Sequence, residues 1–269
     1  MRIGFRTPYK HLPNFSSYVE SLYTCIDISK EIQEVDYIFS APNYPKCLVD
    51  RKLIEDTKAK AILTPSTGTN HIVLDDITVF SITNDPILTE ITSTAEHNLF
   101  LTLKLVRNIE PIRQLSDLTL GILGYGRLGK MLKERTGKLY KDVKVKDKTY
   151  EDKNFFSDID ILSINVDLNS TSNELVDRSF IERFKKKLFI VNTSRGEVVN
   201  EEEVIDLLYS NKVLGYATDV IQEEHTNKYT VLKSENHRNL FVTPHTGGTA
   251  IDAQEKAYKR VIEKLNGLD

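Results

Sequence analysis

The sequence predicts an α/β protein of two domains, each built on a parallel sheet flanked by helices. Short apolar runs alternate with helical patterns along most of the chain, which is the order of βαβ units. The later runs are almost continuously apolar, as strands covered on both faces are. A length of 269 residues is near the size at which one hydrophobic core stops growing, which favours two domains over one.

The first ninety residues contain four apolar runs separated by helical segments. The runs are residues 2–5, 37–41, 61–64 and 77–82, and the helices are expected near 15–24 and 46–56. This alternation predicts a small parallel sheet. The next element begins at Ser93, where Ser93 and Glu96 form a Ser-x-x-Glu capping box, and it keeps helical spacing until Pro111. We expect this long helix to connect the two domains.

The second half of the chain gives stronger strand signals. Six strands are expected at residues 118–123, 142–147, 159–166, 188–193, 213–220 and 240–243. One intervening helix should be capped by Asn200, with Glu203 three residues on. Helical crossovers between buried strands predict a doubly wound parallel sheet. Residues 253–269 have the pattern of one amphipathic helix.

Composition argues against several classes of function. The formal charge is -3, with 36 basic and 39 acidic side chains interspersed, so there is no wide cationic surface for nucleic acid. Cys25 and Cys47 are too few for a disulfide framework and lack metal-ligand spacing, so neither disulfides nor a metal site is expected. The N-terminus has no apolar signal region, and no apolar run is long enough to span a membrane. We therefore expect a cytoplasmic protein.

An apolar strand runs directly into the glycine pattern Gly124-Tyr125-Gly126-Arg127-Leu128-Gly129 and then into a helix. Gly124 would permit a tight turn, Gly126 would let the backbone approach a pyrophosphate, and Gly129 would let the helix pack on the strand. The anion would sit at the positive end of the helix. Eighteen residues after Gly129 the next strand ends in Asp147, where a ribose hydroxyl of a dinucleotide would need an acceptor. A solvated strand-end carboxylate is the alternative for Asp147.

Three polar segments follow three consecutive strands, and they contain Arg195, Glu224 and His245. Because the ends of parallel strands converge on one crevice, these side chains can share a site. His245 is the candidate acid and base for a hydroxyl next to a carboxylate, since the ordinary pKa of histidine suits that role at neutral pH. Glu224 would fix its tautomer and favour the imidazolium. Arg195 would clamp a substrate carboxylate with its planar fork.

These segments resemble the D-isomer-specific 2-hydroxyacid dehydrogenase family, which includes phosphoglycerate, glycerate, D-lactate and formate dehydrogenases. The matching segments are 124–129, 191–199, 219–224 and 244–249, with weaker matches at 67–70 and 94–97. The resemblance implies an NAD-dependent enzyme, with NADP less expected, that moves a hydride to or from C2 of a small D-2-hydroxy or 2-oxo acid. It also implies a homodimer.

The resemblance further assigns domains and site residues. A Rossmann-type dinucleotide domain would span 93–249, and a discontinuous, flavodoxin-like substrate domain would span 1–92 and 250–269. Backbone amides of Thr67 and Gly68 would bind the substrate carboxylate together with Arg195. The residues expected to touch the cofactor are Gly124, Tyr125, Gly126, Arg127, Leu128, Gly129, Asp147, Thr193, Ser194, Asp219 and Gly247.

The sequence also departs from the family pattern. Asn165 and Asp167 stand where the family commonly has His and Pro, His225 replaces a Pro, and the stretch between Asp147 and Ile159 is short. One alternative is a dinucleotide-binding regulator, similar to transcriptional corepressors that share the fold. A hydrolase or lyase on this fold is a third reading, but no cysteine nucleophile or metal cluster supports it. Substrate choice would depend on loops 42–46, with Tyr44, and 66–70, with Asn70, and no rule converts these into a particular acid.

Overall fold

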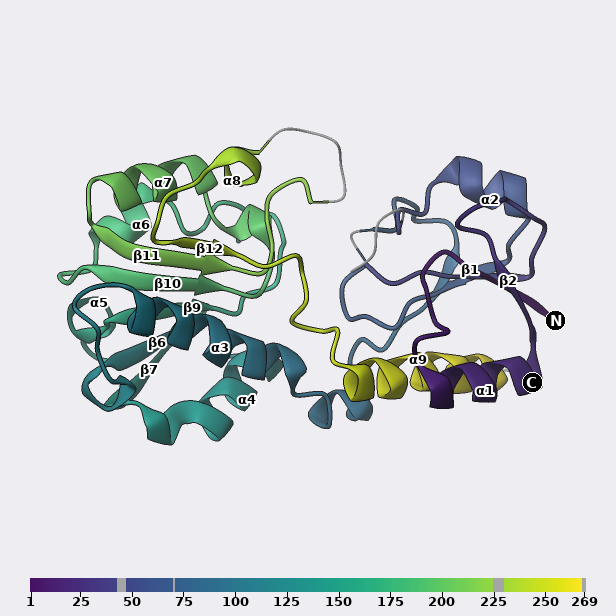
Figure 1. Cartoon of the computed structure of the whole chain (residues 1–269), viewed down its shortest axis with the longest axis horizontal. Helices are drawn as coiled ribbons and strands as arrows, with labels where there is room; N and C mark the ends of the chain where they lie inside the picture. Colours follow the sequence, from purple (N-terminus) through teal and green to yellow (C-terminus); the bar gives the residue numbers. More distant parts are fainter. Residues whose placement is uncertain (43–46, 70, 225–229, 268–269) are drawn as a thin grey trace. The chain divides into compact units, whose positions relative to one another are not determined.

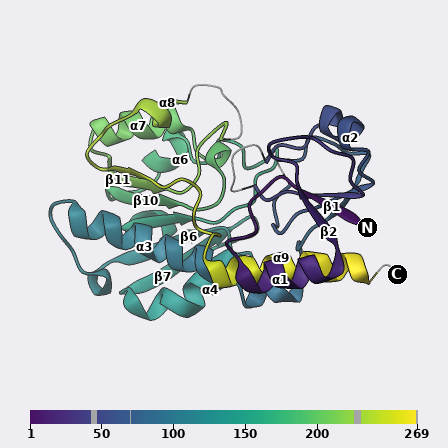
Figure 2. The same cartoon turned by 45° about the vertical axis from the view of Figure 1, so that its right-hand side comes forward.

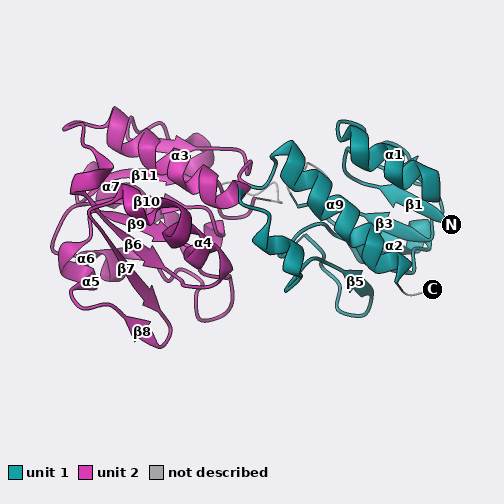
Figure 3. Cartoon of the chain, turned by 90° about the horizontal axis from the view of Figure 1, so that it is seen from below, with its two compact units in different colours: residues 1–92, 248–269 teal, residues 93–247 magenta. Residues whose placement is uncertain are grey.

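The computed structural model describes residues 1–42, 47–69, 71–224 and 230–267. The chain divides into two compact units, Met1–Thr92 with Gly248–Asp269 as unit 1 and Ser93–Gly247 as unit 2 (Figure 3). Each unit contains its own parallel sheet flanked by helices, which confirms the predicted fold class. Among the described residues, no helix is long and apolar enough to cross a membrane.

Unit 1 is built on five parallel strands in the order β2-β1-β3-β4-β5, the order of flavodoxin-like sheets. They are β1 (Arg2–Phe5), β2 (Thr24–Asp27), β3 (Tyr37–Phe39), β4 (Ala61–Leu63) and β5 (Thr78–Phe80). The sequence did not predict β2 and assigned its first residue to a helix. This strand lies at the edge of the sheet and is only partly buried, so it lacks a continuous apolar run.

Helices cover both faces of the unit 1 sheet. They are α1 (Pro13–Leu22), α2 (Arg51–Thr57), the 3-10 helix η1 (Pro86–Thr89) and α9 (Ile251–Asn266). Helices α1 and α9 lie side by side on one face, where Phe15 and Tyr258 pack on Phe5 and Phe39 (Figure 1). The expected helix from residue 46 instead begins at Arg51, because the side chain of Asp50 accepts a hydrogen bond from the Leu53 amide at 2.9 Å and caps it.

Unit 2 is built on seven strands in the order β12-β11-β10-β9-β6-β7-β8. They are β6 (Thr119–Leu123), β7 (Asp142–Asp147), β8 (Tyr150–Glu151), β9 (Ile161–Ile164), β10 (Leu188–Asn192), β11 (Val213–Thr218) and β12 (Leu240–Val242). The six predicted strands are present and parallel, and β8 adds a short antiparallel edge. From β6 the chain proceeds to β7 on one side and then to β9 on the other. The strand order therefore reverses beside β6, which is where such sheets bind ligands.

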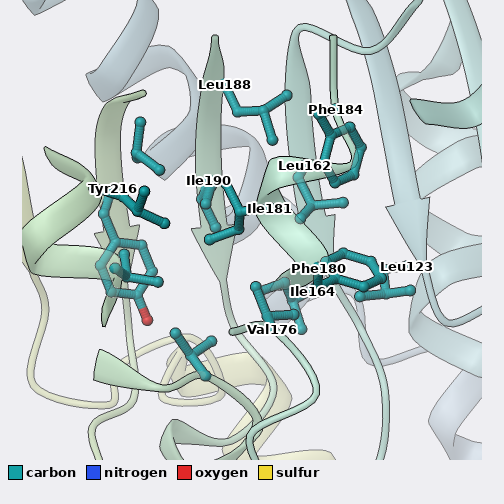
Figure 4. Close-up of a cluster of buried hydrophobic side chains, with 14 of the residues drawn as sticks. Leu123, Leu162, Ile164, Val176, Phe180, Ile181, Phe184, Leu188, Ile190 and Tyr216 are labelled. Atoms are coloured by element: carbon teal, nitrogen blue, oxygen red, sulfur yellow. The ribbon is translucent and has the colours of Figure 1, made fainter. Parts of the chain in front are cut away.

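Two groups of helices sandwich this sheet. Helices α3 (Ser93–Asn108) and α4 (Arg127–Thr136) cover one face, and α5 (Phe155–Asp158), α6 (Arg178–Glu182) and α7 (Glu201–Tyr209) cover the other (Figures 1 and 2). Helix α8 (Val231–Ser234) packs beside α7, and η2 (Leu115–Asp117), η3 (Gly137–Leu139) and η4 (Gly196–Val198) are 3-10 turns. Figure 4 shows the second face, where Phe180, Ile181 and Phe184 meet Leu162 and Ile190. This packing fixes the strand ends that carry the polar loops.

Two helix starts test the predicted caps. Asn200 caps α7, as expected, because its Oδ1 accepts a hydrogen bond from the Glu203 amide at 3.1 Å. Ser93 does not act as the cap of α3. It is itself the first helical residue, and its buried hydroxyl has no hydrogen-bond partner among the described residues. The Ser-x-x-Glu pattern therefore located this helix correctly but assigned the wrong role to Ser93.

Candidate active site

The glycine-rich turn joins β6 to α4, and each of its three glycines meets a different constraint. Gly124 has φ +91°, and a Cβ there would lie 2.8 Å from the backbone of Asn165. A Cβ on Gly129 would lie 2.2 Å from the carbonyl oxygen of Gly124. A Cβ on Gly126 would meet nothing within 4 Å. The first and third glycines are thus required by the fold, whereas Gly126 keeps open the space at the N-terminus of α4.

Asp147 ends β7, the strand beside β6, and is partly buried. Its Oδ1 accepts a hydrogen bond from the Lys148 amide at 2.8 Å. The cation before it, Lys146, is held by Glu151 at 2.6 Å across the β7–β8 turn. The carboxylate therefore lies at the carboxyl end of the sheet next to the glycine turn, and no lysine among the described residues pairs with it.

His245 and Glu224 are brought together from two different loops. His245 Nδ1 and Glu224 Oε2 are hydrogen bonded at 2.9 Å, and their side chains are 17% and 23% exposed. His245 follows β12 and has φ +53°, a left-handed backbone conformation that is uncommon for a residue with a side chain. Such a conformation in a polar loop is typical of functional sites.

Arg195 leaves the end of β10 through a turn that Asn192 organises. The Asn192 Oδ1 accepts hydrogen bonds from the Ser194 amide at 3.0 Å and hydroxyl at 2.9 Å, and its Nδ2 donates to the Arg195 carbonyl at 2.9 Å. Arg195 Nη1 donates to the Ser194 carbonyl at 2.6 Å. Burial lowers the pKa of the guanidinium, and Glu224 is the carboxylate that opposes this shift most. The predicted trio therefore shares one electrostatic environment in unit 2.

Asp219 anchors the loop that carries His245. Its Oδ1 accepts hydrogen bonds from the Thr243 hydroxyl at 2.5 Å and the Thr246 amide at 2.8 Å, and its Oδ2 accepts one from the Gly247 amide at 2.7 Å. His97 of α3 lies 3.2 Å from Oδ1. Burial alone would raise the pKa of Asp219, but the hydrogen bonds outweigh it and hold the pKa below its usual range.

A second buried network lies under Thr193. Asn98 of α3, which is 1% exposed, donates to the Thr193 hydroxyl at 3.0 Å and accepts from the Ser163 hydroxyl at 3.2 Å. Asn165 donates to the same Ser163 hydroxyl at 2.9 Å. The roles of His97, Asn98 and Ser163 were not predicted from the sequence. The available signal was a polar residue, Asn98, on the apolar stripe of α3.

Glu201 is a further residue that the sequence did not reveal. It is 1% exposed, and its Oε1 accepts a hydrogen bond from the Gln222 amide at 2.6 Å, two residues before Glu224. Gln222 in turn donates from Nε2 to the Val199 carbonyl at 2.9 Å. A Cβ on Gly196 would lie 2.0 Å from the backbone of Ile221, so this loop packs tightly on η4. Burial raises the pKa of Glu201 to about 7.

The predicted substrate loop lies in unit 1, after β4. The Thr67 carbonyl accepts a hydrogen bond from the Thr83 hydroxyl at 2.9 Å, and the Gly68 carbonyl accepts one from the Ser66 hydroxyl at 2.5 Å. The bond to the Thr67 carbonyl orients the peptide group that contains the Gly68 amide, one of the two amides that the resemblance assigns to a carboxylate. Tyr44, Asn70 and His225 lie outside the described residues.

The remaining predicted cofactor residues lie around the same strand ends of unit 2. Tyr125 and Leu128 are partly buried in the glycine turn, and Ser194 is buried beside Arg195. Burial lowers the pKa of Arg127, and Asp167 opposes this shift. The fold and these strand-end groups together define a dinucleotide-dependent oxidoreductase.

The chain belongs to the D-isomer specific 2-hydroxyacid dehydrogenase family. The sequence model that describes the NAD binding domain of that family matches residues 94–247, which is more than half of the chain. This match confirms the resemblance drawn from the motifs, and it confirms NAD as the cofactor. Unit 2, which carries the glycine turn, is the NAD-binding domain.

Individual relatives are distant but cover most of the chain. Formate dehydrogenase of Candida boidinii is 25% identical over 286 residues, covering 89% of this chain and 78% of the relative. A D-specific alpha-keto acid dehydrogenase of Enterococcus faecium is 27% identical over 248 residues, covering 78% of this chain and 75% of the relative.

Solved structures share the fold. The NAD-dependent formate dehydrogenase of Staphylococcus aureus, in complex with NAD, has a TM-score of 0.78 at 24% identity and covers 99% of this chain and 95% of its own. D-lactate dehydrogenase of Aquifex aeolicus, complexed with NAD and lactic acid, has a TM-score of 0.78 at 20% identity, with 100% and 95% covered.

Proposed function

We propose that this NAD-dependent dehydrogenase transfers a hydride between the nicotinamide and C2 of a small D-2-hydroxy or 2-oxo acid, with His245 as the acid and base. The observation that carries the proposal is the 2.9 Å hydrogen bond between His245 Nδ1 and Glu224 Oε2 in a loop system that also contains Arg195. The names of relatives point the same way, since they act as formate, D-lactate or alpha-keto acid dehydrogenases.

The residues present fit a bound dinucleotide. The open space over Gly126 and the N-terminus of α4 suit a pyrophosphate, and Asp147 on the neighbouring strand suits a ribose. We assign the other contacts to Tyr125, Arg127, Leu128, Thr193, Ser194, Asp219 and Gly247, which lie in the glycine turn and in the loops after β10, β11 and β12. When bound, NAD supplies or accepts the hydride.

His245 moves the proton that accompanies the hydride. A proton on Nδ1 is held toward the Glu224 carboxylate, so the other ring nitrogen, Nε2, is the atom assigned to the substrate oxygen. During reduction of a 2-oxo acid, protonated His245 donates a proton to the C2 oxygen, and during oxidation it takes that proton back. Glu224 stabilises the charged ring in both directions.

Arg195 binds the substrate carboxylate and polarises the reacting oxygen. Its guanidinium stays charged, and its partly buried position strengthens the attraction for an anion. The amides of Thr67 and Gly68 in unit 1 are proposed as further carboxylate contacts. Because the turn around Asn192 fixes the backbone on both sides of Arg195, the guanidinium starts from a defined position.

An assay of NADH oxidation with pyruvate, glyoxylate, hydroxypyruvate, phosphohydroxypyruvate and branched-chain 2-oxo acids tests the proposal. We expect turnover with at least one acid and at least a hundredfold loss in His245→Ala, with NADH affinity retained. Absence of turnover with every acid, together with tight NADH binding, would instead support the dinucleotide-binding regulator. The relatives named above give that alternative no support.

We also propose that the protein is a homodimer in the cytoplasm. Size-exclusion chromatography with light scattering measures the mass in solution, and a mass of 30.8 kDa, that of one chain, would contradict the dimer. Cell fractionation tests the location, which differs among relatives, since the formate dehydrogenase of Arabidopsis thaliana is named as chloroplastic or mitochondrial.

A further inference from the structure

Arg6 lies at the carboxyl edge of the unit 1 sheet, directly after β1. Its amide donates to the Phe39 carbonyl at 2.9 Å, and the Ser40 amide donates to the Leu63 carbonyl at 3.0 Å. The ends of β1, β3 and β4 therefore lie in sequence along one edge. Ligands of open parallel sheets bind outside this edge.

The charge of Arg6 is not compensated within the part of the chain that the structure describes. Its Nε is buried without a hydrogen-bond partner, and among the described residues Arg6 forms no ion pair. Burial lowers the pKa of Arg6, opposed most by Asp50, but the Asp50 carboxylate caps α2. By contrast, Arg51 pairs with Asp76 at 2.6 Å.

An uncompensated, partly buried cation costs stability. The next residue, Thr7, is 2% exposed and also has a buried hydroxyl without a partner. Two unsatisfied polar groups at the ligand-binding edge of a sheet are typical of a site that an anion completes.

We propose that Arg6 binds a second anionic group of the substrate, either a carboxylate or a phosphate. This inference rests on the proposed function, in which the first carboxylate meets the amides of Thr67 and Gly68 after β4. One strand separates β1 from β4, so their ends are about 10 Å apart, two strand spacings. The long side chain of Arg6 reaches across part of that distance. The substrate is then a short 2-oxo acid with a negative group at its far end.

Kinetics of wild type and Arg6→Gln in a buffer without phosphate test the proposal. Pyruvate and 2-oxobutyrate have one anionic group, 2-oxoglutarate adds a carboxylate, and phosphohydroxypyruvate adds a phosphate. We expect at least one dianionic acid to have a kcat/KM tenfold or more above the monoanionic acids. Arg6→Gln should remove this advantage by raising KM, with kcat/KM for pyruvate unchanged. Whichever dianionic acid loses most in the variant identifies the group.

Arg2→Gln is the matched control, because Arg2 is exposed at the opposite end of the same strand. It removes the same charge and should leave the preference intact. The melting temperature separates binding from packing. Loss of an uncompensated cation should leave it unchanged or raise it, whereas loss of a packing group would lower it. Equal losses for all acids in Arg6→Gln, or no loss, would overturn the proposal.

Ligand binding tests the role of Arg6 even where no catalysis is observed. If no acid is turned over, the proposed function fails. Calorimetric titration of 2-oxoglutarate and phosphohydroxypyruvate into wild type and Arg6→Gln then decides the role of Arg6. Binding that the variant weakens tenfold or more supports the site, and equal binding, or none to wild type, contradicts it.

Discussion

Two regions of the unit 2 sheet, one beside β6 and β7 and the other after β11 and β12, differ in how their proposed ligand sites are built. Beside β6 and β7, a Cβ on Gly126 would meet nothing within 4 Å, and among the described residues Asp147 accepts a hydrogen bond from its neighbouring amide alone. After β11 and β12, Asp219 accepts hydrogen bonds from Thr243, Thr246 and Gly247. The proposed nucleotide side is thus defined by open space, and the proposed catalytic side by fixed polar atoms. Proton transfer requires such preorganisation, whereas phosphate binding requires close backbone approach.

Among the variants that follow, Arg195→Lys should cause the largest fall in turnover. The ammonium keeps the charge but not the fork that grips two oxygens, so we expect turnover to fall at least tenfold with NADH affinity nearly unchanged. Steady-state kinetics and a cofactor titration measure both quantities. Unchanged turnover would remove Arg195 from the site.

Glu224→Gln tests whether the pairing with His245 supports catalysis. The amide can still accept the Nδ1 hydrogen bond of 2.9 Å, but it cannot balance the charge of the protonated ring. We expect turnover in 2-oxo acid reduction to fall about tenfold, without a change in melting temperature. Glu223→Gln, one residue away, is the control. If both variants retain full activity, Glu224 does not assist His245.

Gly126→Ala tests the open nucleotide end. Since the new methyl group meets no protein atom within 4 Å, the fold should persist and the melting temperature should stay within a few degrees. The methyl would occupy the space assigned to the pyrophosphate, so the Kd for NADH should rise about tenfold. Gly137→Ala, where the methyl would lie 3.6 Å from Val143, is the control at the other end of α4. Equal NADH affinity in all three proteins would contradict the assignment.

Asp147→Ala tests the cofactor choice. In NADP a phosphate with roughly two negative charges would stand against this carboxylate, so the native protein should prefer NADH over NADPH. The ratio of kcat/KM for NADH and NADPH should fall severalfold in the variant. A native protein that uses both cofactors equally, or an unchanged ratio, would show that Asp147 does not read the ribose.

A related contrast, between local sequence signals and contacts from distant elements, explains which features the sequence predicted. Strands with continuous apolar runs, such as β9 and β10, were predictable because both faces are buried. Edge strands β2 and β8 were missed, since one is partly exposed and the other has only two residues. Gly124–Gly129 has a local motif, and the close contacts that require Gly124 and Gly129 lie within the turn or beside it. The groups that hold the catalytic loops come from distant elements.

Glu201 illustrates this limit. It is one of three consecutive glutamates at the start of α7, a position where acidic residues are favoured by the helix dipole alone. The sequence does not distinguish the buried Glu201 from the exposed Glu202. Only the packing of the loop at Gln222 onto α7 makes Glu201 a partner of that loop. His97 and Asn98 were missed for the same reason, because their partners lie 65 or more residues away.

Glu201→Gln should change the pH dependence of stability while leaving turnover at neutral pH intact. Burial raises the pKa of Glu201 in the folded protein to about 7, above the value near 4.3 of an unfolded chain. The folded state therefore holds a proton that the unfolded state has lost, and stability falls as pH rises from about 4.3 and levels off above 7. Glu197 adds to the raised pKa and Lys233 opposes it.

Glutamine keeps an acceptor for the Gln222 amide but does not ionise, so the Glu224 loop should stay in place. The variant should exceed wild type at pH 8 by roughly 4 kcal/mol at most, with a smaller difference at pH 6. Thermal unfolding midpoints from pH 5 to pH 9 measure this, with Glu202→Gln as the exposed control. A Glu201→Gln curve parallel to that of wild type would mean that the buried carboxyl does not titrate in this range, and that the Gln222 loop is held by an ordinary ionised carboxylate.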